Sequence, residues 1–255
     1  MKKYLPFVVP VYSWGERYAY TFIRVVAGAM FIPHGVQKLT QGNLALGGLE
    51  LVAGVLLVLG VVPRVMALLL ALDVLWIISL NIGKGWLWTR GGVQYHVFLL
   101  GMLLAVMVGG GGWHAIKTHL SGKYPAIGYA LARVWFALLI LPSGYEKIFE
   151  GGAARIAAGN VLKTGFHPPL FWAWTVASLE FFGMMLLAVG LFTRPIAFAF
   201  AVQLGVITFM LQMPNGYFWT SRGMEFALAL FLVCIAFVFG GGGRYSLDRR
   251  IGREF

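Results

Sequence analysis

Eight long apolar runs leave this chain few ways to fold. They lie near residues 18–38, 45–62, 64–82, 93–109, 127–148, 168–192, 194–212 and 223–240. A helix that crosses a bilayer needs about 20 mostly apolar residues. Because lipid offers no partner to a free backbone amide, such runs must be helices. They are too long and too unalternating to be strands of a membrane barrel. We therefore expect an all-α polytopic membrane protein with eight transmembrane helices.

The charge content supports this class and excludes others. Only 11% of the residues are charged and 60% are apolar, whereas a soluble domain carries about 25% charge. The net charge of +11 does not indicate nucleic-acid binding, because most Lys and Arg residues stand at the ends of apolar runs, where they anchor helices among lipid headgroups. The expected partner is the lipid bilayer.

The chain also repeats itself. The first apolar run matches the fifth, and the residues that follow continue the match. The first matched set is Arg24, Pro33, Gly35 and Lys38 with Arg133, Pro142, Gly144 and Lys147, and the second is Glu50, Gly60 and Arg64 with Glu180, Gly190 and Arg194. Trp88-Thr89 and the glycines at 109–112 recur as Trp219-Thr220 and 240–243. An even number of helices per unit predicts two parallel four-helix repeats.

The repeat divides the chain into expected parts. These are an N-terminal interfacial segment at 1–17, a first four-helix unit at 18–122, a second unit at 123–243 and a basic tail at 244–255. The second unit has about 21 additional residues near 150–170, either a surface lid or a plain connection. Lys and Arg divide eleven to seven across the spans. This bias predicts a multi-pass protein of the cell inner membrane with both termini in the cytoplasm.

Two ionisable residues lie deep in the first unit. Arg24 falls in the inner half of the first run, and Asp73 lies near the middle of the third. We expect each to have a partner or a function, because a charge at the centre of a spanning helix costs about 2.5–3.5 kcal/mol. We expect a structural ion pair between them, with a proton relay or an anion contact as the alternative. In the second unit Arg133 would face Gln203.

The outer half of each unit holds a candidate site. Glu50 and Glu180 lie below the headgroups and are the candidate catalytic residues, as proton acceptors. The expected cofactor-binding residues are Lys38, Trp88, Gln94 and His96 in the first unit, and Lys147, Trp219 and Glu225 in the second. Carboxylates, an amine and aromatic walls can bind a polar headgroup. The alternative is that the lysines snorkel, the tryptophans form an interfacial belt and each Glu pairs locally.

Haem and metal sites are disfavoured. His34 and His96 are placed to meet across two helices, and paired imidazoles can ligate haem iron. However, Ser143 and Ala227 replace them in the second unit. His114 and His119 fit one helical face poorly, so we expect no metal there. The single cysteine excludes a redox pair within the chain.

Several motifs together resemble the DoxX/DoxD family. They are the arginine of the first run, HGVQKL at 34–39, Glu50, LGVVPR at 59–64, GWLWT at 85–89 and, above all, NGYFWTSRGMEF from residue 215. Family members usually have one four-helix unit, and this chain is similar to two fused units. The second unit departs from the pattern at Ser143, where the family often has His.

The resemblance implies quinone-linked redox work in a complex. The family is named for subunits of a terminal quinol oxidase, and related members are subunits of a thiosulfate:quinone oxidoreductase. Our leading hypothesis is an integral membrane subunit that binds a quinone or quinol headgroup near the outer leaflet, with other subunits of the complex carrying electrons. Whether the chain is itself quinone-reactive or non-catalytic stays open. The alternatives are a structural anchor for a larger oxidase and a small-molecule transporter.

Overall fold

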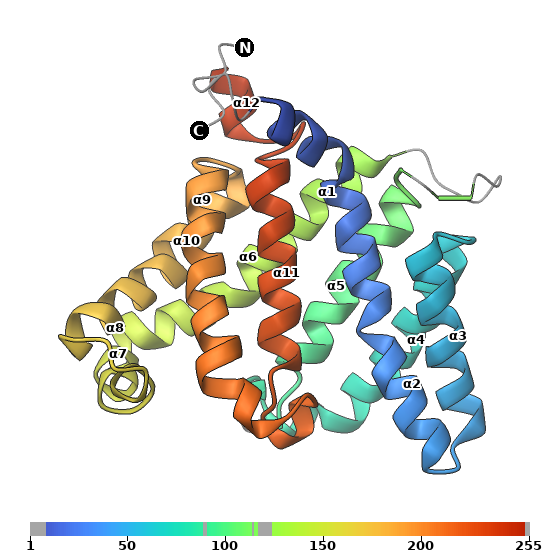
Figure 1. Cartoon of the computed structure of the whole chain (residues 1–255), viewed down its shortest axis with the longest axis horizontal. Helices are drawn as coiled ribbons and strands as arrows, with labels where there is room; N and C mark the ends of the chain where they lie inside the picture. The colour runs from blue at the N-terminus through green and yellow to red at the C-terminus, as the bar shows by residue number, and fades with distance from the viewer. Residues whose placement is uncertain (1–8, 89–90, 114, 117–123, 253–255) are drawn as a thin grey trace. The chain divides into compact units, whose positions relative to one another are not determined.

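The computed structural model describes residues 9–88, 91–113, 115–116 and 124–252, and these residues form helices and loops without a strand. The predicted all-α class is therefore confirmed for this part of the chain. Figure 1 shows the arrangement of the helices. The α-helices are α1 (Val9–Ala29), α2 (Phe31–Thr40), α3 (Leu44–Leu59), α4 (Pro63–Asn81), α5 (Gln94–Gly109), α6 (Pro125–Phe149), α7 (Gly152–Ile156), α8 (Pro169–Ser178), α9 (Met184–Val189), α10 (Thr193–Val206), α11 (Glu225–Gly240) and α12 (Leu247–Ile251).

Five helical stretches in the described part are long and apolar enough to cross a membrane. They are Ser13–Thr40, Pro63–Lys84, Pro125–Phe149, Pro169–Val189 and Thr193–Asn215. The chain is therefore a polytopic membrane protein. Three shorter apolar helices, α3, α5 and α11, occupy the other predicted runs. Each has 16 residues and rises only about 24 Å at 1.5 Å per residue, so the count of eight spans stays a prediction.

The long stretches contain irregular turns. The first bends at Met30, between α1 and α2, three residues before Pro33. Proline at that position lacks the amide that would bond the preceding turn. The fourth runs from α8 through a π-helical turn, Leu179–Gly183, into α9. α10 continues into a second π-helical turn, Ile207–Gln212.

The chain separates into two compact units. One runs to Ala132 and includes Gly243–Tyr245, and the other consists of Arg133–Gly242 and the chain from Ser246 onward. The division falls inside α6, ten residues beyond the unit boundary that the repeat predicts. We call them the N-terminal and the C-terminal unit. The predicted four-helix repeat stays a prediction, although both units contain the same local devices.

The turn that precedes α4 and α10 is one such device. Gly60 and Gly190 have φ of 75° and 73°, a left-handed conformation that favours glycine. Each donates to a carbonyl three residues back, and the next amide reaches five residues back, to Leu56 and Leu186. This paired bonding satisfies the last carbonyls of a helix. The same sequence pattern therefore ends α3 and α9 in the same way.

Glycine also brings α2 and α3 into close contact in the N-terminal unit. A Cβ on Gly35 would lie 2.5 Å from the Leu51 amide nitrogen, and one on Gly47 would lie 2.8 Å from that of Leu39. Any larger side chain would push the two helices apart. Figure 1 shows α2, α3 and α4 side by side. This close packing sets the position of the polar residues described below.

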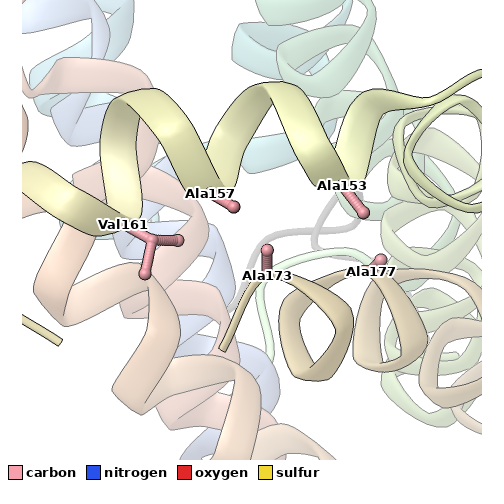
Figure 2. Packing of buried hydrophobic residues seen from close by; sticks show 5 residues of the cluster. All are labelled: Ala153, Ala157, Val161, Ala173 and Ala177. Atoms are coloured by element: carbon pink, nitrogen blue, oxygen red, sulfur yellow. The ribbon is translucent and has the colours of Figure 1, made fainter. Parts of the chain in front are cut away.

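The additional segment of the C-terminal unit is helical. It comprises α7 and a π-helical turn, Ala157–Val161, and it packs on α8. Figure 2 shows the contact, in which small side chains of the two elements face one another; they are Ala153, Ala157, Val161, Ala173 and Ala177. The segment is thus anchored to α8 through small side chains.

Both chain ends contain a feature that the sequence did not predict. α1 begins at Val9, so part of the segment expected at the interface, 1–17, belongs to the first helix. In the expected basic tail, Asp248 is buried and its carboxylate accepts hydrogen bonds from the amides of Phe192 (2.8 Å) and Thr193 (2.9 Å). It caps the start of α10, where unpaired amides attract a negative charge. Nothing in its local sequence indicates this distant role.

Candidate functional site

An ion pair forms the centre of the candidate site in the N-terminal unit. Lys38, in the last turn of α2, places its Nζ 2.6 Å from Oε1 of Glu50 on α3. The Glu50 side chain is 2% exposed and that of Lys38 is 23% exposed. Gly35 lies one helical turn before Lys38 and contacts Leu51, which follows Glu50. The glycine contact and the ion pair therefore hold the same stretch of the two helices together.

Asp73 on α4 is the third member of this site. Its carboxyl approaches that of Glu50 closely enough for a side-chain hydrogen bond, and it is also buried. Neither Glu50 Oε2 nor Asp73 Oδ2 has a hydrogen-bond partner. Two ionised carboxylates are both acceptors, so only a proton on one of them can join them. We call Lys38, Glu50 and Asp73 the acidic triad.

The C-terminal unit contains a matching group with one change. Lys147 on α6 forms an ion pair with Oε2 of Glu180. Gln203 on α10 donates from Nε2 to Glu180 Oε1 at 2.7 Å. A Cβ on Gly144 would lie 2.5 Å from the Phe181 amide nitrogen, as Gly35 does beside Leu51. We call Lys147, Glu180 and Gln203 the amide triad, because an amide stands where the other unit has Asp73.

The local backbone differs between the two groups. Glu50 lies in regular α-helix, whereas Glu180 lies in the π-helical turn Leu179–Gly183. A π-helical turn inserts an extra residue and is often found at functional positions. It rotates the residues that follow it relative to those that precede it. Sequence periodicity alone did not predict this turn.

The predicted ion pair between Arg24 and Asp73 is wrong. Arg24 is 2% exposed, and its guanidinium donates to the carbonyls of Gly111 (2.6 Å) and Val58 (3.2 Å). Arg133 likewise donates to the carbonyls of Gly242 and Ala188, and Gln203 bonds Glu180 rather than facing Arg133. Depth along the membrane predicted the wrong partner, because it does not fix how each helix is rotated about its axis.

The two predicted histidines lie near the acidic triad. His34 on α2 packs against Tyr95, with 6.5 Å between ring centroids, and Tyr95 contacts His96 at 5.5 Å. His96, at the start of α5, is buried and lies within electrostatic range of His34, Lys38 and Lys84. At the positions that match these two histidines, the C-terminal unit has Ser143 and Ala227, neither of which titrates.

The remaining predicted binding residues lie in or beside the loops before α5 and α11. Gln94 is buried as the first residue of α5, and Trp88 is half-buried in the loop that precedes it. Thr89 lies outside the described residues. Glu225, the first residue of α11, accepts a hydrogen bond from the Trp219 amide at 3.0 Å. Glu225 thus fixes the loop that carries Trp219, whose ring is half-buried.

The carboxylate of Glu225 also affects the pKa of Tyr217 in the same loop. Burial and the neighbouring charge of Glu225 both raise the pKa of its hydroxyl. Tyr217 therefore stays protonated across the physiological pH range and keeps a hydroxyl donor.

Metal ligation finds no support in the described part of the chain, where no three His, Cys, Asp or Glu side chains gather closely enough to hold an ion. The histidines considered for a metal, His114 and His119, lie outside the described residues. The chemistry on offer at the triads is instead that of proton exchange and of hydrogen bonding to a polar ligand.

Part of the chain matches a known protein family. Residues 128–213 match the DoxX family model, and this range contains Lys147, Glu180 and Gln203. An uncharacterized protein of Haemophilus influenzae (strain ATCC 51907 / DSM 11121 / KW20 / Rd) is 29% identical over 141 residues, which cover 52% of this chain and 96% of that protein. No solved structure matches the chain.

Proposed function

Because residues 128–213 are a DoxX domain of a multi-pass membrane protein, we propose that the chain is an integral membrane subunit of a quinone-linked redox complex. In this proposal it binds a quinone or quinol headgroup at its buried Lys–Glu pairs. Electrons pass through other subunits, because the side chains of the triads exchange protons and do not carry electrons. The complex lies in the inner membrane, and both termini of this chain face the cytoplasm.

The observation that carries the proposal is the presence of buried acceptor atoms without a donor. They are Gln203 Oε1 in the amide triad and, when both acids of the acidic triad are ionised, Glu50 Oε2 and Asp73 Oδ2. A buried polar atom without a partner is costly, by about 1–3 kcal/mol. A quinol supplies two hydroxyl donors on a flat apolar ring that is itself soluble in lipid. Its hydroxyls therefore suit these acceptors better than a quinone, whose oxygens only accept.

Lys38 allows the same site to bind the oxidised form, the quinone. The Lys38 ammonium is partly exposed at 23%, while its partner Glu50 is not. An ammonium has three donors and no acceptor, so it can bond Glu50 and a quinone carbonyl together. The pair thus offers a donor to the quinone and an acceptor to the quinol. Glu50 and Glu180 would take up protons released when the quinol is oxidised.

Binding of a short-chain quinol to the purified protein tests this function. We expect wild type to bind in equilibrium dialysis from detergent and Glu50→Gln to bind about tenfold to a hundredfold more weakly. The reason is the loss of a hydrogen bond to a charged acceptor, worth about 1.5–3 kcal/mol, where 1.4 kcal/mol is tenfold. Glu180→Gln reports on the amide triad in the same way.

The matched control is Glu146→Gln. Glu146 is an acid of the same type and pairs with exposed Arg155 at 2.9 Å, outside both triads. It should bind quinol as wild type does. Size-exclusion profiles and melting temperatures establish that each variant is folded. Unchanged affinity in both Glu50→Gln and Glu180→Gln would reject the triads as the binding sites.

The ion pairs themselves favour a second candidate, a structural anchor for a larger oxidase. Lys38–Glu50 and Lys147–Glu180 each join two different helices, as expected if they only hold the bundle together. An anchor predicts no saturable quinol binding by wild type. It also predicts that Glu50→Gln and Glu180→Gln lose stability without a change in any ligand affinity.

A further inference from the structure

The two triads differ at one position that decides their protonation. In the amide triad, Gln203 donates a neutral N–H to Glu180. In the acidic triad, Asp73 stands in the same relation to Glu50, and a carboxyl can donate only when it is protonated. We infer that Glu50 and Asp73 hold one exchangeable proton between them beside Lys38, and that Gln203 removes this capacity from the C-terminal unit.

Charge balance supports the shared proton. Lys147 and Glu180 are one cation and one anion, and Gln203 adds none, so the amide triad is neutral. With both acids ionised, the acidic triad would hold two anions against one cation, although Glu50 is 2% and Asp73 6% exposed. Like charges this close in a dry site cannot both ionise without a large cost. One proton makes the acidic triad neutral as well.

Among the described residues of the surrounding helices, Lys38 is the cation that forms an ion pair with these acids. α3 packs against α1, α2 and α4. The charged groups that act on Glu50 are Lys38 of α2 and Asp73 of α4. On α1, Arg24 donates to the carbonyls of Gly111 and Val58. His96 of α5 lies within electrostatic range of Lys38 and His34.

The asymmetry extends beyond one residue. Asp73, His34 and His96 correspond to Gln203, Ser143 and Ala227 in the repeat. These three titratable groups of the N-terminal unit are thus replaced by groups that do not titrate near neutral pH. In the other direction, Gln94 corresponds to Glu225, whose carboxylate accepts a hydrogen bond from the Trp219 amide. The N-terminal unit is the proton-exchanging one, because a second acid lies beside its Lys–Glu pair. This inference names the active half of the proposed quinone site, but it concerns a proton exchanged with water and needs no quinone.

Infrared difference spectroscopy of the reconstituted protein, recorded on a pH change without quinone, tests the inference. A protonated carboxyl absorbs in its C=O stretching band, apart from ionised carboxylates, and this band shifts in D₂O. Exposed carboxyls titrate at about pH 4, so the spectra are compared above that range. There we expect one such titrating signal in wild type and its loss in Asp73→Asn, whose amide takes the role of Gln203. Gln203→Glu should add a second signal, because it recreates the acid pair beside Lys147. Glu146→Gln is the control without effect.

The outcomes separate this inference from the proposed function. An Asp73→Asn spectrum identical to that of wild type overturns the shared proton. If Asp73→Asn does not fold, Gln203→Glu decides, and the absence of an added signal overturns the inference. Quinol dialysis on the same samples is independent: a titrating signal without quinol binding keeps the proton site and rejects the quinone function. Quinol binding without the titrating signal keeps the quinone function and rejects the proton site.

Discussion

Lys38→Met should unfold at a markedly lower temperature than wild type. The substitution removes the ammonium that lies 2.6 Å from Glu50 and strands a buried acid pair. Breaking a buried ion pair by removing one partner costs about 3–5 kcal/mol, because the remaining charge is uncompensated. Thermal unfolding of the purified protein in mild detergent measures the effect. The loss should shrink as the pH falls, because protonation neutralises the stranded carboxylates.

The double variant Lys38→Met/Glu50→Gln isolates the cause. It removes both charges and should recover most of the stability lost by Lys38→Met alone, a coupling that a double-mutant cycle measures directly. Lys163→Met, at an exposed position, should unfold as wild type does. A Lys38→Met protein that melts at the wild-type temperature would mean that the ion pair contributes nothing to the fold.

Arg24→Met should cause the second large loss of stability. Arg24 is 2% exposed, and its guanidinium bonds two carbonyls, that of Gly111 at 2.6 Å and that of Val58 at 3.2 Å. Each of the two carbonyls left unpaired costs about 1–3 kcal/mol, so the free energy of unfolding should fall by about 2–6 kcal/mol. Thermal unfolding measures the loss.

Arg24→Lys and Arg133→Met refine this prediction. Lysine keeps the charge but cannot place a planar pair of donors on two carbonyls, so Arg24→Lys should fall between wild type and Arg24→Met. Arg133→Met should destabilise to a similar extent, since Arg133 bonds the carbonyls of Gly242 and Ala188. Arg250→Met, exposed on α12, is the control. Equal stability of Arg24→Met and wild type would mean that the guanidinium does not stabilise the fold.

The sequence predicts the helices well because the bilayer dictates their length. The run predicted at 93–109 is α5 (Gln94–Gly109), and that at 127–148 lies within α6 (Pro125–Phe149). Apolar length and the glycine turns at Gly60 and Gly190 mark such boundaries directly. The break at Met30 and the π-helical turn at Glu180 were not predicted, because both arise from local bonding that hydropathy does not record.

Side-chain partners are harder to predict than helix bounds. The sequence singles out Lys38, Glu50, Lys147 and Glu180, and their role as a binding site stays a prediction. The alternative that each Glu pairs locally agrees with the two ion pairs. Arg24 and Asp73 were paired wrongly, since similar depth does not make two side chains face each other. The position of Gly35 would have helped to predict the partner of Lys38. Gly35 and Lys38 share a helical face, so the close α2–α3 contact also brings Lys38 to Glu50.

The central claim is that a quinol binds beside the buried Lys–Glu pairs, and photolabelling tests it most directly. The purified wild-type protein is irradiated with an azido-quinone, with and without excess unlabelled quinone, and the modified residues are located by peptide mass spectrometry. We predict labelling confined to the surroundings of the two triads, and its loss when excess quinone competes. In the N-terminal unit these are α2, α3 and the segment from Trp86 to His96, and in the C-terminal unit they are α6, the turn Leu179–Gly183 and the segment from Tyr217 to Glu225. Labels scattered over the lipid-facing helices, or labels that excess quinone does not displace, would contradict the account.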